Sequence, residues 1–337
     1  MIKKLKGTKD LLMTFVSLLV AVLVYGIFLI ISGVNPLDIY SQMITQTLGN
    51  GYGIGQVIVK STPFILVAVA TTISAKAGLV NVGGEGQLVL GALTSTIAAV
   101  FLLDGFPSFI GIPLMAVAGM LGGMFWSGLA GVMRVGWNMN ETLTTVIMNY
   151  IAYDIVAYAV YGRLKDPESF NWPMSPKIGA QLKLPEIYPG VSIGIIIAVV
   201  ISLTTWFILS KSTGGYKLRV IGGNVEAARH AGIPVAATQI KAFLISGAIS
   251  GLAGMIEIAG VEGRLRTTTG TNYGYYGFLA AWMAWNNPLA AIFTALLIGF
   301  LSVSGNVVEI SSGLPSSCTK ILMAIILLSI LWKGKKK

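Results

Sequence analysis

The sequence is poor in charged residues. Asp, Glu, Lys and Arg make up only 11% of its 337 residues, whereas about a quarter of the residues in a soluble domain are charged. Hydrophobic residues account for 55%, and the mean hydropathy is +0.79. Several apolar runs reach the roughly 18 residues that a helix needs to cross a bilayer. These proportions exclude an ordinary soluble domain and predict an all-α polytopic membrane protein.

The chain also has few residues of the kinds used in catalysis or metal binding. It contains one cysteine, Cys318, which excludes an internal disulfide, and one histidine, His230. Metal sites and catalytic sets built from Cys and His are therefore unsupported. The G-x-x-x-x-G-K-[ST], H-E-x-x-H and G-x-S-x-G motifs are absent. We expect a protein that is not an enzyme, holds no metal or other cofactor, and binds no ATP through a phosphate-binding loop.

The formal net charge of +10 is concentrated at the two ends of the chain. The terminal lysines are Lys3, Lys4, Lys6 and Lys9 at one end, and Lys333, Lys335, Lys336 and Lys337 at the other. Basic clusters that flank apolar helices mark the cytoplasmic side of a membrane. We therefore expect both termini in the cytoplasm, an even number of crossings, and no nucleic-acid partner.

About ten apolar segments are expected as transmembrane or re-entrant helices within a single membrane domain, 1–337. They cover roughly 11–32, 55–75, 85–103, 109–133, 142–161, 190–210, 239–259, 274–286, 288–308 and 316–333. The third and eighth are short or broken, so ten crossings and eight crossings with two re-entrant pieces both fit. The basic loop of about 211–238 is then cytoplasmic, and the Pro-rich loop of about 162–189 is extracytoplasmic.

Small residues recur at helical spacing in two of these segments. Gly119, Gly123, Ser127 and Gly131 follow one another every four residues in the fourth segment. Gly247 and Gly251 have the same spacing in the seventh. Small residues at this spacing let helix backbones approach closely in lipid, so we expect these faces to pack against other helices.

Polar residues interrupt the stretch LVNVGGEGQLVLGA, residues 79–92. Asn81, Glu85 and Gln87 border three of its glycines. Glycines allow a broken backbone, which is tolerated at membrane depth where protein or water covers it. A charged side chain inside a membrane normally faces the bundle interior or a water-filled path. We predict that these residues support or line a solute pathway, with Glu85 either anchoring exposed backbone N–H groups near these glycines or contacting the solute.

Two further polar patches suggest the same pathway. Asn140 and Glu141 open the stretch NETLTTVIMNY, in which Glu141, Thr145 and Asn149 share one helix face. In YGFLAAWMAWNNPLAA, Trp282 and Asn286 precede a proline that would end a half-helix, a pattern found in transporters. Alternatively, the tryptophans of this patch form an interfacial aromatic belt.

The predicted cytoplasmic loop contains the sequence GGNVEAARHAGI at residues 222–233. Residues 226–229 predict a short helix that Asn224 would cap and Gly232 would end. A short charged helix between two spans suits the groove of a soluble partner. The alternative is a solvated helix with no partner.

Five motifs, in order and at family-like spacing, together resemble the permease family of ATP-binding cassette (ABC) importers for simple sugars and nucleosides, which is related to ribose and branched-chain amino-acid permeases. They are NVGGEGQLVLGAL (81–93), NETLTTVIMNYIA (140–152), GGNVEAARHAGI (222–233), GFLAAWMAWNNPLAAIFTALLIGF (277–300) and GLPSSCTKILMAIILLSIL (313–331). Gly84, and the tryptophan-bearing stretch 282–285, depart from the family's usual residues.

The resemblance implies a subunit of the bacterial cytoplasmic membrane that pairs with a second permease subunit, either a different chain or a copy of this one. ATP would be bound by partner ATP-binding subunits, and an extracytoplasmic substrate-binding protein would deliver a nucleoside or sugar. By the same resemblance, the ATPase-coupling residues are Asn224, Glu226, Ala227, Arg229 and Gly232. The alternative function is an ion-coupled secondary transporter that uses Glu85 or Glu141.

Overall fold

The computed structural model describes residue 16 and residues 19–334, and this part of the chain is mostly helical. Clustering of contacts divides the chain into two compact units: Met1–Lys60 with Leu296–Lys337, and Ser61–Ala295. We call these the terminal unit and the central unit. The terminal lysine clusters lie outside the described residues except at Lys333, so the placement of both termini in the cytoplasm stays a prediction.

The terminal unit begins with a sharply bent helix pair. The helix Leu19–Ile31 meets α2 (Pro36–Leu48) at 117°. α2 begins where the Asn35 side chain accepts a hydrogen bond from the N–H of Leu37, with Pro36 in the first turn. The Tyr40 hydroxyl donates to the backbone oxygen of Val22 at 2.6 Å, which ties the pair together. The hydropathy pattern does not predict α2, because its polar residues interrupt the apolar run.

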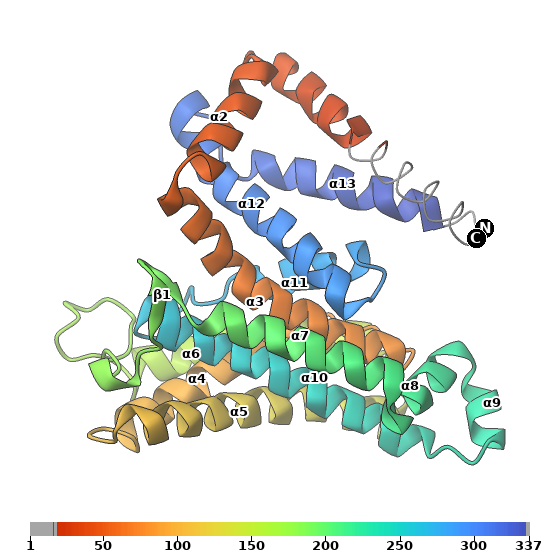
Figure 1. Cartoon of the computed structure of the whole chain (residues 1–337). Helices are drawn as coiled ribbons and strands as arrows, with labels where there is room; N and C mark the ends of the chain where they lie inside the picture. Colours follow the sequence, from red (N-terminus) through yellow and green to blue (C-terminus); the bar gives the residue numbers. More distant parts are fainter. Residues whose placement is uncertain (1–15, 17–18, 335–337) are drawn as a thin grey trace. The chain divides into compact units, whose positions relative to one another are not determined.

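The central unit is a bundle of long helices (Figure 1). Its members are the end of α3 (Gly51–Lys76), α4 (Gly84–Phe101), α5 (Ser108–Trp137), α6 (Glu141–Tyr161), α7 (Gly194–Lys211) and α10 (Val235–Glu257). α4 contacts α5, α6 and α10 and is buried along most of its length. α5 and α7 instead expose large apolar side chains such as Phe125 and Phe207, as expected of helices that face lipid.

The predicted close packing of small-residue faces is confirmed where α5 crosses α10. A Cβ atom on Gly123 would lie only 2.7 Å from the Cα atom of Gly251, so the two backbones touch without an intervening side chain. Ser127 Oγ donates to the backbone oxygen of Phe243 at 2.6 Å in the same interface. These small residues allow an approach that any larger side chain would prevent.

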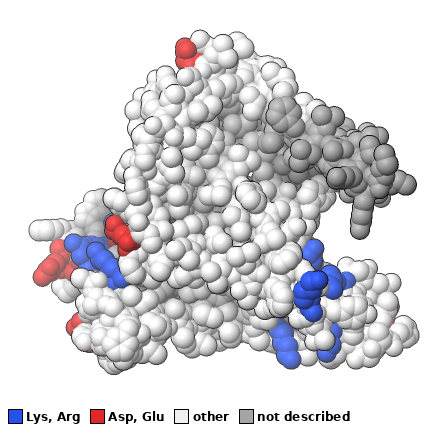
Figure 2. Space-filling model, in the orientation of Figure 1, with Lys and Arg blue, Asp and Glu red and all other residues white. Residues whose placement is uncertain are grey.

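Shorter elements connect the bundle. β1 (Glu186–Tyr188) pairs antiparallel with β2 (Val191–Ser192), following the turn η1 (Ala180–Leu182). α8 (Thr213–Gly223) and α9 (Val225–His230) form the predicted coupling loop, and η2 (Ile258–Glu262) is a π-helical extension of α10. α11 (Tyr273–Met283) is a half-length helix, and α12 (Pro288–Ser312) and α13 (Cys318–Gly334) complete the chain. Figure 2 shows charged side chains at both ends of the central unit, near α8 and near β1, with an uncharged band between them.

Within the described residues, seven helices are long and apolar enough to cross a membrane, or eight if the bent pair counts as one span. The all-α polytopic architecture is therefore confirmed, and each of the ten predicted segments contains a helix. α11 has only 11 residues, as the expectation of a short eighth segment required. The third segment is an uninterrupted helix of 18 residues; the break lies just before it, at 77–83.

Candidate functional site

The connection between α3 and α4, residues 77–83, has non-helical backbone inside the central unit. The polar face of α6 lies against it and against the first turn of α4. The Glu141 carboxylate accepts from Val80 N at 3.4 Å, and the Thr145 hydroxyl accepts from Val82 N at 3.2 Å. The Asn149 amide donates to Val82 O at 3.1 Å and accepts from Gly86 N at 2.8 Å. Irregular backbone at membrane depth needs such internal partners. The predicted stripe on α6 exists, and it faces backbone.

The amides of Asn81 and Gln87 lock this connection to its neighbours. Asn81 Oδ1 accepts from Gly83 N at 2.9 Å and from Gln87 Nε2 at 3.1 Å. Asn81 Nδ2 donates to Ser246 Oγ on α10 at 3.0 Å. Asn81 and Gln87 are 2% and 1% exposed. Every polar atom of the Asn81 side chain therefore has a protein partner.

Glu85 anchors a different element, the half-helix α11. Its carboxylate accepts hydrogen bonds from Asn272 N at 3.0 Å, from Tyr275 N at 3.3 Å and from the hydroxyl of Tyr153. The first N–H groups of a helix have no partner inside the helix, and that end carries partial positive charge. A carboxylate that is 2% exposed satisfies both needs here. Glu85 does accept from backbone N–H groups, but these belong to the start of α11 and not to the glycines beside it, where the sequence predicted them.

The two remaining polar residues at the start of α6 have local partners. Asn140 caps α6 by accepting from Thr142 N at 3.0 Å and Leu143 N at 3.1 Å. Glu141 forms an ion pair with Arg134 at 3.1 Å. Their contribution to a solute pathway stays a prediction. No group of three or more His, Cys, Asp or Glu side chains in the described part of the chain could hold a metal ion.

Trp282 and Asn286 have a different setting, because they line a cavity of about 230 Å³, which we call the inner cavity. Its walls are formed by Thr71, Ala75, Gly78, Leu79, Val80, Asn81, Phe278, Trp282 and Asn286. None of these side chains is charged. Trp282 Nε1 and Asn286 Oδ1 are buried and have no hydrogen-bond partner among the described residues. The structure thus brings Asn81, Trp282 and Asn286 together, as one pathway would require.

The sequence analysis missed two walls of this cavity, Thr71 and Phe278. Thr71 lies in an apolar helix beside Thr72, whose hydroxyl bonds to the backbone oxygen of Ala68 at 2.8 Å. The sequence does not distinguish a threonine whose hydroxyl bonds to its own helix backbone from a threonine that lines a cavity. Phe278 precedes Trp282 by one helical turn, and their ring centroids lie 5.7 Å apart. The spacing of these two aromatics was the available signal.

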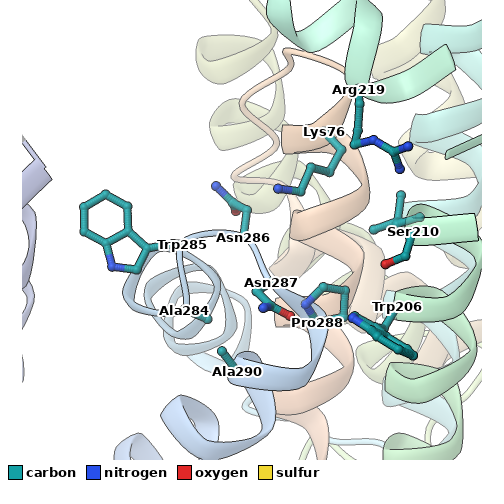
Figure 3. A pocket seen from close by; sticks show the side chains of 11 residues that line it. Lys76, Trp206, Ser210, Arg219, Ala284, Trp285, Asn286, Asn287, Pro288 and Ala290 are labelled. Carbon is teal, nitrogen blue, oxygen red and sulfur yellow. The ribbon is translucent and has the colours of Figure 1, made fainter. Parts of the chain in front are cut away.

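A second cavity, the outer cavity, measures about 670 Å³ and shares Asn286 with the first (Figure 3). It is lined by Lys76, Trp206, Leu209, Ser210, Arg219, Ala284, Trp285, Asn286, Asn287, Pro288 and Ala290. Neither Lys76 nor Arg219 forms an ion pair with another described residue. The sequence analysis identified neither cation as a site residue, because they lie more than 140 positions apart in sequence.

The turn between α11 and α12 forms the wall at which the two cavities meet. Trp285 and Asn286 have φ angles of 54° and 51°, in the left-handed region that costs an L-residue about 1 kcal/mol. Bonds from Asn286 N to Ala281 O (2.9 Å) and from Leu289 N to Asn287 Oδ1 (3.1 Å) hold the turn. In Figure 3 the Trp285 ring points away from the other labelled side chains. Backbone strain of this kind concentrates at functional sites.

The predicted local structure of the coupling segment is confirmed. Asn224 Oδ1 caps α9 by accepting from Ala227 N at 3.1 Å, and Gly232 takes a left-handed φ of 72° beyond the helix end. Glu226 and Arg229 form an exposed ion pair at 2.8 Å. On the opposite side Ala228 is buried in a small core that includes Ile221 of α8. α9 therefore packs against α8 through Ala228 and exposes the charged side chains of Glu226 and Arg229.

α8 connects this helix to the connection before α4. A Cβ atom on Gly222 would lie 3.3 Å from the backbone nitrogen of Gly78. The backbone of α8 therefore packs directly against the backbone of the connection, with no side chain between them. Gly78 also lines the inner cavity, so α8 contacts a residue of the cavity wall.

Comparison with known proteins agrees with this architecture. The sequence profile of the family described as branched-chain amino acid transport system / permease component matches residues 53–331. The chain is 32% identical to the glucose ABC transporter permease protein of Haloferax volcanii, over 94% of this chain and 85% of that protein. It is 30% identical to the guanosine ABC transporter permease protein of Bacillus subtilis, over 96% and 94%. It is 26% identical to a nucleoside ABC transporter permease protein of Lactococcus lactis, over 96% and 91%.

These matches confirm the resemblance seen in the sequence motifs. The matched family supplies transport components, and membership implies an ATP-binding subunit and a substrate-binding partner. The apolar helices of the described chain place it in the cytoplasmic membrane, which it crosses several times. The chain belongs to the family of ABC transporter permeases, and it is a transport component rather than an enzyme.

Proposed function

We propose that this chain forms the translocation pathway of an ABC importer for an uncharged nucleoside or simple sugar. The observation that best supports this proposal is the inner cavity. Its nine lining residues include hydroxyl, amide and indole groups but no charged side chain. An amino acid would bring two charges into this cavity without an opposite charge to meet them. The names of the relatives, which are for glucose, guanosine and nucleosides, support the same substrate class.

The subunit works by alternating access, which ATP binding and hydrolysis on a partner subunit drive. This chain itself binds no ATP and no cofactor. It pairs with a second permease subunit, a different chain in the arrangement we favour and a copy of this one in the alternative. About ten transmembrane or re-entrant helices, with both termini in the cytoplasm, place the α8–α9 loop on the ATPase side. The family relationship gives no support to the ion-coupled alternative.

The proposed ATPase contact is α9. Its exposed face carries Glu226 and Arg229, while Ala228 on the opposite face packs in a small apolar core with Ile221 of α8. α8 in turn meets the connection before α4 at Gly222 and Gly78. A displacement of α9 by the ATPase therefore has a short, rigid path to the inner cavity.

The substitution Arg229→Glu tests this contact. It replaces the exposed ion pair by two like charges on the docking face, so ATP-dependent uptake should be lost while the amount of chain in the membrane stays unchanged. Co-purification of the ATP-binding subunit should also be lost. Lys177→Glu, an exposed charge reversal in the segment between α6 and α7, is the matched control. Normal uptake by the Arg229→Glu variant would remove α9 from the coupling path.

A gentle purification of the native complex tests the assembly. A tagged chain should retain an ATP-binding subunit and a second permease subunit, and mass spectrometry would show whether the second subunit is a different chain. A chain that purified alone and carried solute in liposomes without ATP would contradict the importer function.

A further inference from the structure

We propose that the inner cavity binds the planar, uncharged ring of a nucleobase, with Trp282 Nε1 as donor to the ring and the Asn286 side chain as acceptor from it. This inference rests on the proposed function and chooses between its two substrate classes. It assigns base recognition to the junction of α11 and α12, in a cavity confined to the central unit.

The first observation is an unpartnered donor and an unpartnered acceptor on the side chains of two residues that line one cavity. Trp282 Nε1 and Asn286 Oδ1 are both buried, and neither bonds to another described residue. A buried polar group without a partner costs about 1–3 kcal/mol, and buried side chains of this kind are normally satisfied. The cost is recovered if a ligand supplies one acceptor and one donor. A nucleobase carries both on its edge.

The second observation is the size and lining of the cavity. A volume of about 230 Å³ is below the roughly 300–1,000 Å³ of sites for drug-sized ligands, so a small ring system is the appropriate occupant. Phe278 contributes aromatic surface to its wall, beside the Trp282 side chain whose N–H is the proposed donor. Contact between a base and an aromatic side chain contributes about 1–3 kcal/mol in single-stranded nucleic-acid complexes.

The third observation separates a base from a sugar. A free hexose carries hydroxyls around its whole ring, and each one buried without a partner costs about 1–3 kcal/mol. Among its side chains, the inner cavity offers few polar groups to meet them, on Trp282, Asn286 and Thr71. The Asn81 amide lines the wall, but Gly83, Gln87 and Ser246 already occupy its polar atoms. The few unoccupied polar side chains of the cavity therefore match the hydrogen-bonding groups on one edge of a flat heterocycle.

The position of Asn286 adds a functional consequence. It lines both cavities and has a left-handed φ of 51°, next to Trp285 at 54°. A base held by this side chain contacts the strained turn that separates the inner from the outer cavity. Binding therefore engages the segment whose rearrangement would join the two cavities.

The test is equilibrium binding to the purified permease–ATPase complex, without the substrate-binding protein, by calorimetry with guanosine, uridine, free guanine, glucose and ribose. Binding of a nucleoside and of the free base, with neither sugar binding, is the expected result. Trp282→Phe keeps an aromatic ring and removes the N–H, so nucleoside affinity should fall about tenfold, equivalent to about 1.4 kcal/mol. Asn286→Gly keeps the left-handed backbone and removes the amide, and should lower affinity similarly. Trp137→Phe, at an exposed site outside both cavities, is the control.

The outcomes separate this inference from the proposed function. If the wild-type complex binds glucose and no nucleoside, the base assignment is wrong while the importer function stands. Unchanged nucleoside affinity in both Trp282→Phe and Asn286→Gly also overturns the assignment. If reconstituted vesicles with the binding protein show no ATP-dependent uptake of any nucleoside or sugar, the proposed function itself fails. A melting temperature for each variant shows whether lost binding reflects lost folding.

Discussion

The connection before α4 and the turn between α11 and α12 are both irregular segments with polar residues inside an apolar bundle. Around the connection, the side chains of Asn81, Glu85 and Asn149 all bond to protein groups. At the turn, Trp282 Nε1 and Asn286 Oδ1 have no partner among the described residues. The polar groups of the first region satisfy irregular backbone, whereas these two atoms of the second region satisfy no protein group.

This difference predicts opposite responses to substitution. Removing a polar group from the connection leaves its partner buried and unsatisfied, which costs free energy of folding. Removing an unpartnered group at the turn breaks no protein bond, so the effect should appear in binding. The two regions can be compared by measuring melting temperature and nucleoside affinity on the same set of variants.

The largest loss of stability is expected for Glu85→Leu. The N–H groups of Asn272 and Tyr275 and the hydroxyl of Tyr153 would lose their buried acceptor, and three such losses cost about 3–9 kcal/mol together. We expect little chain in the membrane and a much lower melting temperature for what remains. Glu85→Gln, which keeps an acceptor, should fall between this variant and wild type. Asp154→Leu, at an exposed carboxylate on α6, is the control; equal damage there would contradict the anchoring role of Glu85.

Asn149→Leu should have the next largest effect. It removes the acceptor of Gly86 N and the donor to Val82 O, and two such losses cost about 2–6 kcal/mol together. Transport should therefore decrease together with thermal stability. A variant with normal stability and impaired transport would show instead that Asn149 serves the pathway directly, as the polar stripe first suggested.

Thr145→Val should have a smaller effect of about 1–3 kcal/mol, because one buried N–H, that of Val82, loses its acceptor. The replacement has nearly the same shape, so the loss reports on the hydrogen bond alone. Thr145→Ser restores the hydroxyl and should return the melting temperature close to that of wild type. No difference between the valine and serine variants would mean that water or another group satisfies Val82.

The smallest effect on folding is expected for Trp282→Phe. No protein hydrogen bond is lost there, so the change in the free energy of unfolding should stay below about 1 kcal/mol, apart from a small loss of packing. The melting temperature should be close to that of wild type although nucleoside affinity falls. A large destabilisation would place Trp282 with the structural residues and remove the contrast between the two regions.

Local patterns in the sequence predicted local structure well. The short helix after Asn224, with Gly232 beyond its end, lies where the capping residues placed it. The small-residue faces of α5 and α10 pack against another helix, as their spacing indicated. The helix end and each small-residue face depend on residues within a few turns of one another, so a linear pattern contains that information. That the two faces pack against each other is a long-range contact, which the spacing does not predict.

Partners across long separations could not be predicted. The sequence placed Glu141, Thr145 and Asn149 on one face of α6 but could not show that this face meets the backbone of residues 80–86. It gave no sign that Glu85 bonds to N–H groups 187 and 190 positions away. Apolar patterning also left α2 unassigned, because its polar residues resemble those of a loop.

The sequence by itself determined that this chain is a helical membrane protein of the ABC permease type, because composition, hydropathy and short motifs persist without tertiary contacts. Only the tertiary structure decided which polar residues bond to other protein groups and which line a cavity. The physical reason is that a buried amide, hydroxyl or carboxylate has the same identity in either setting. Its role depends on whether the surrounding chain supplies the hydrogen-bond partner that water no longer can.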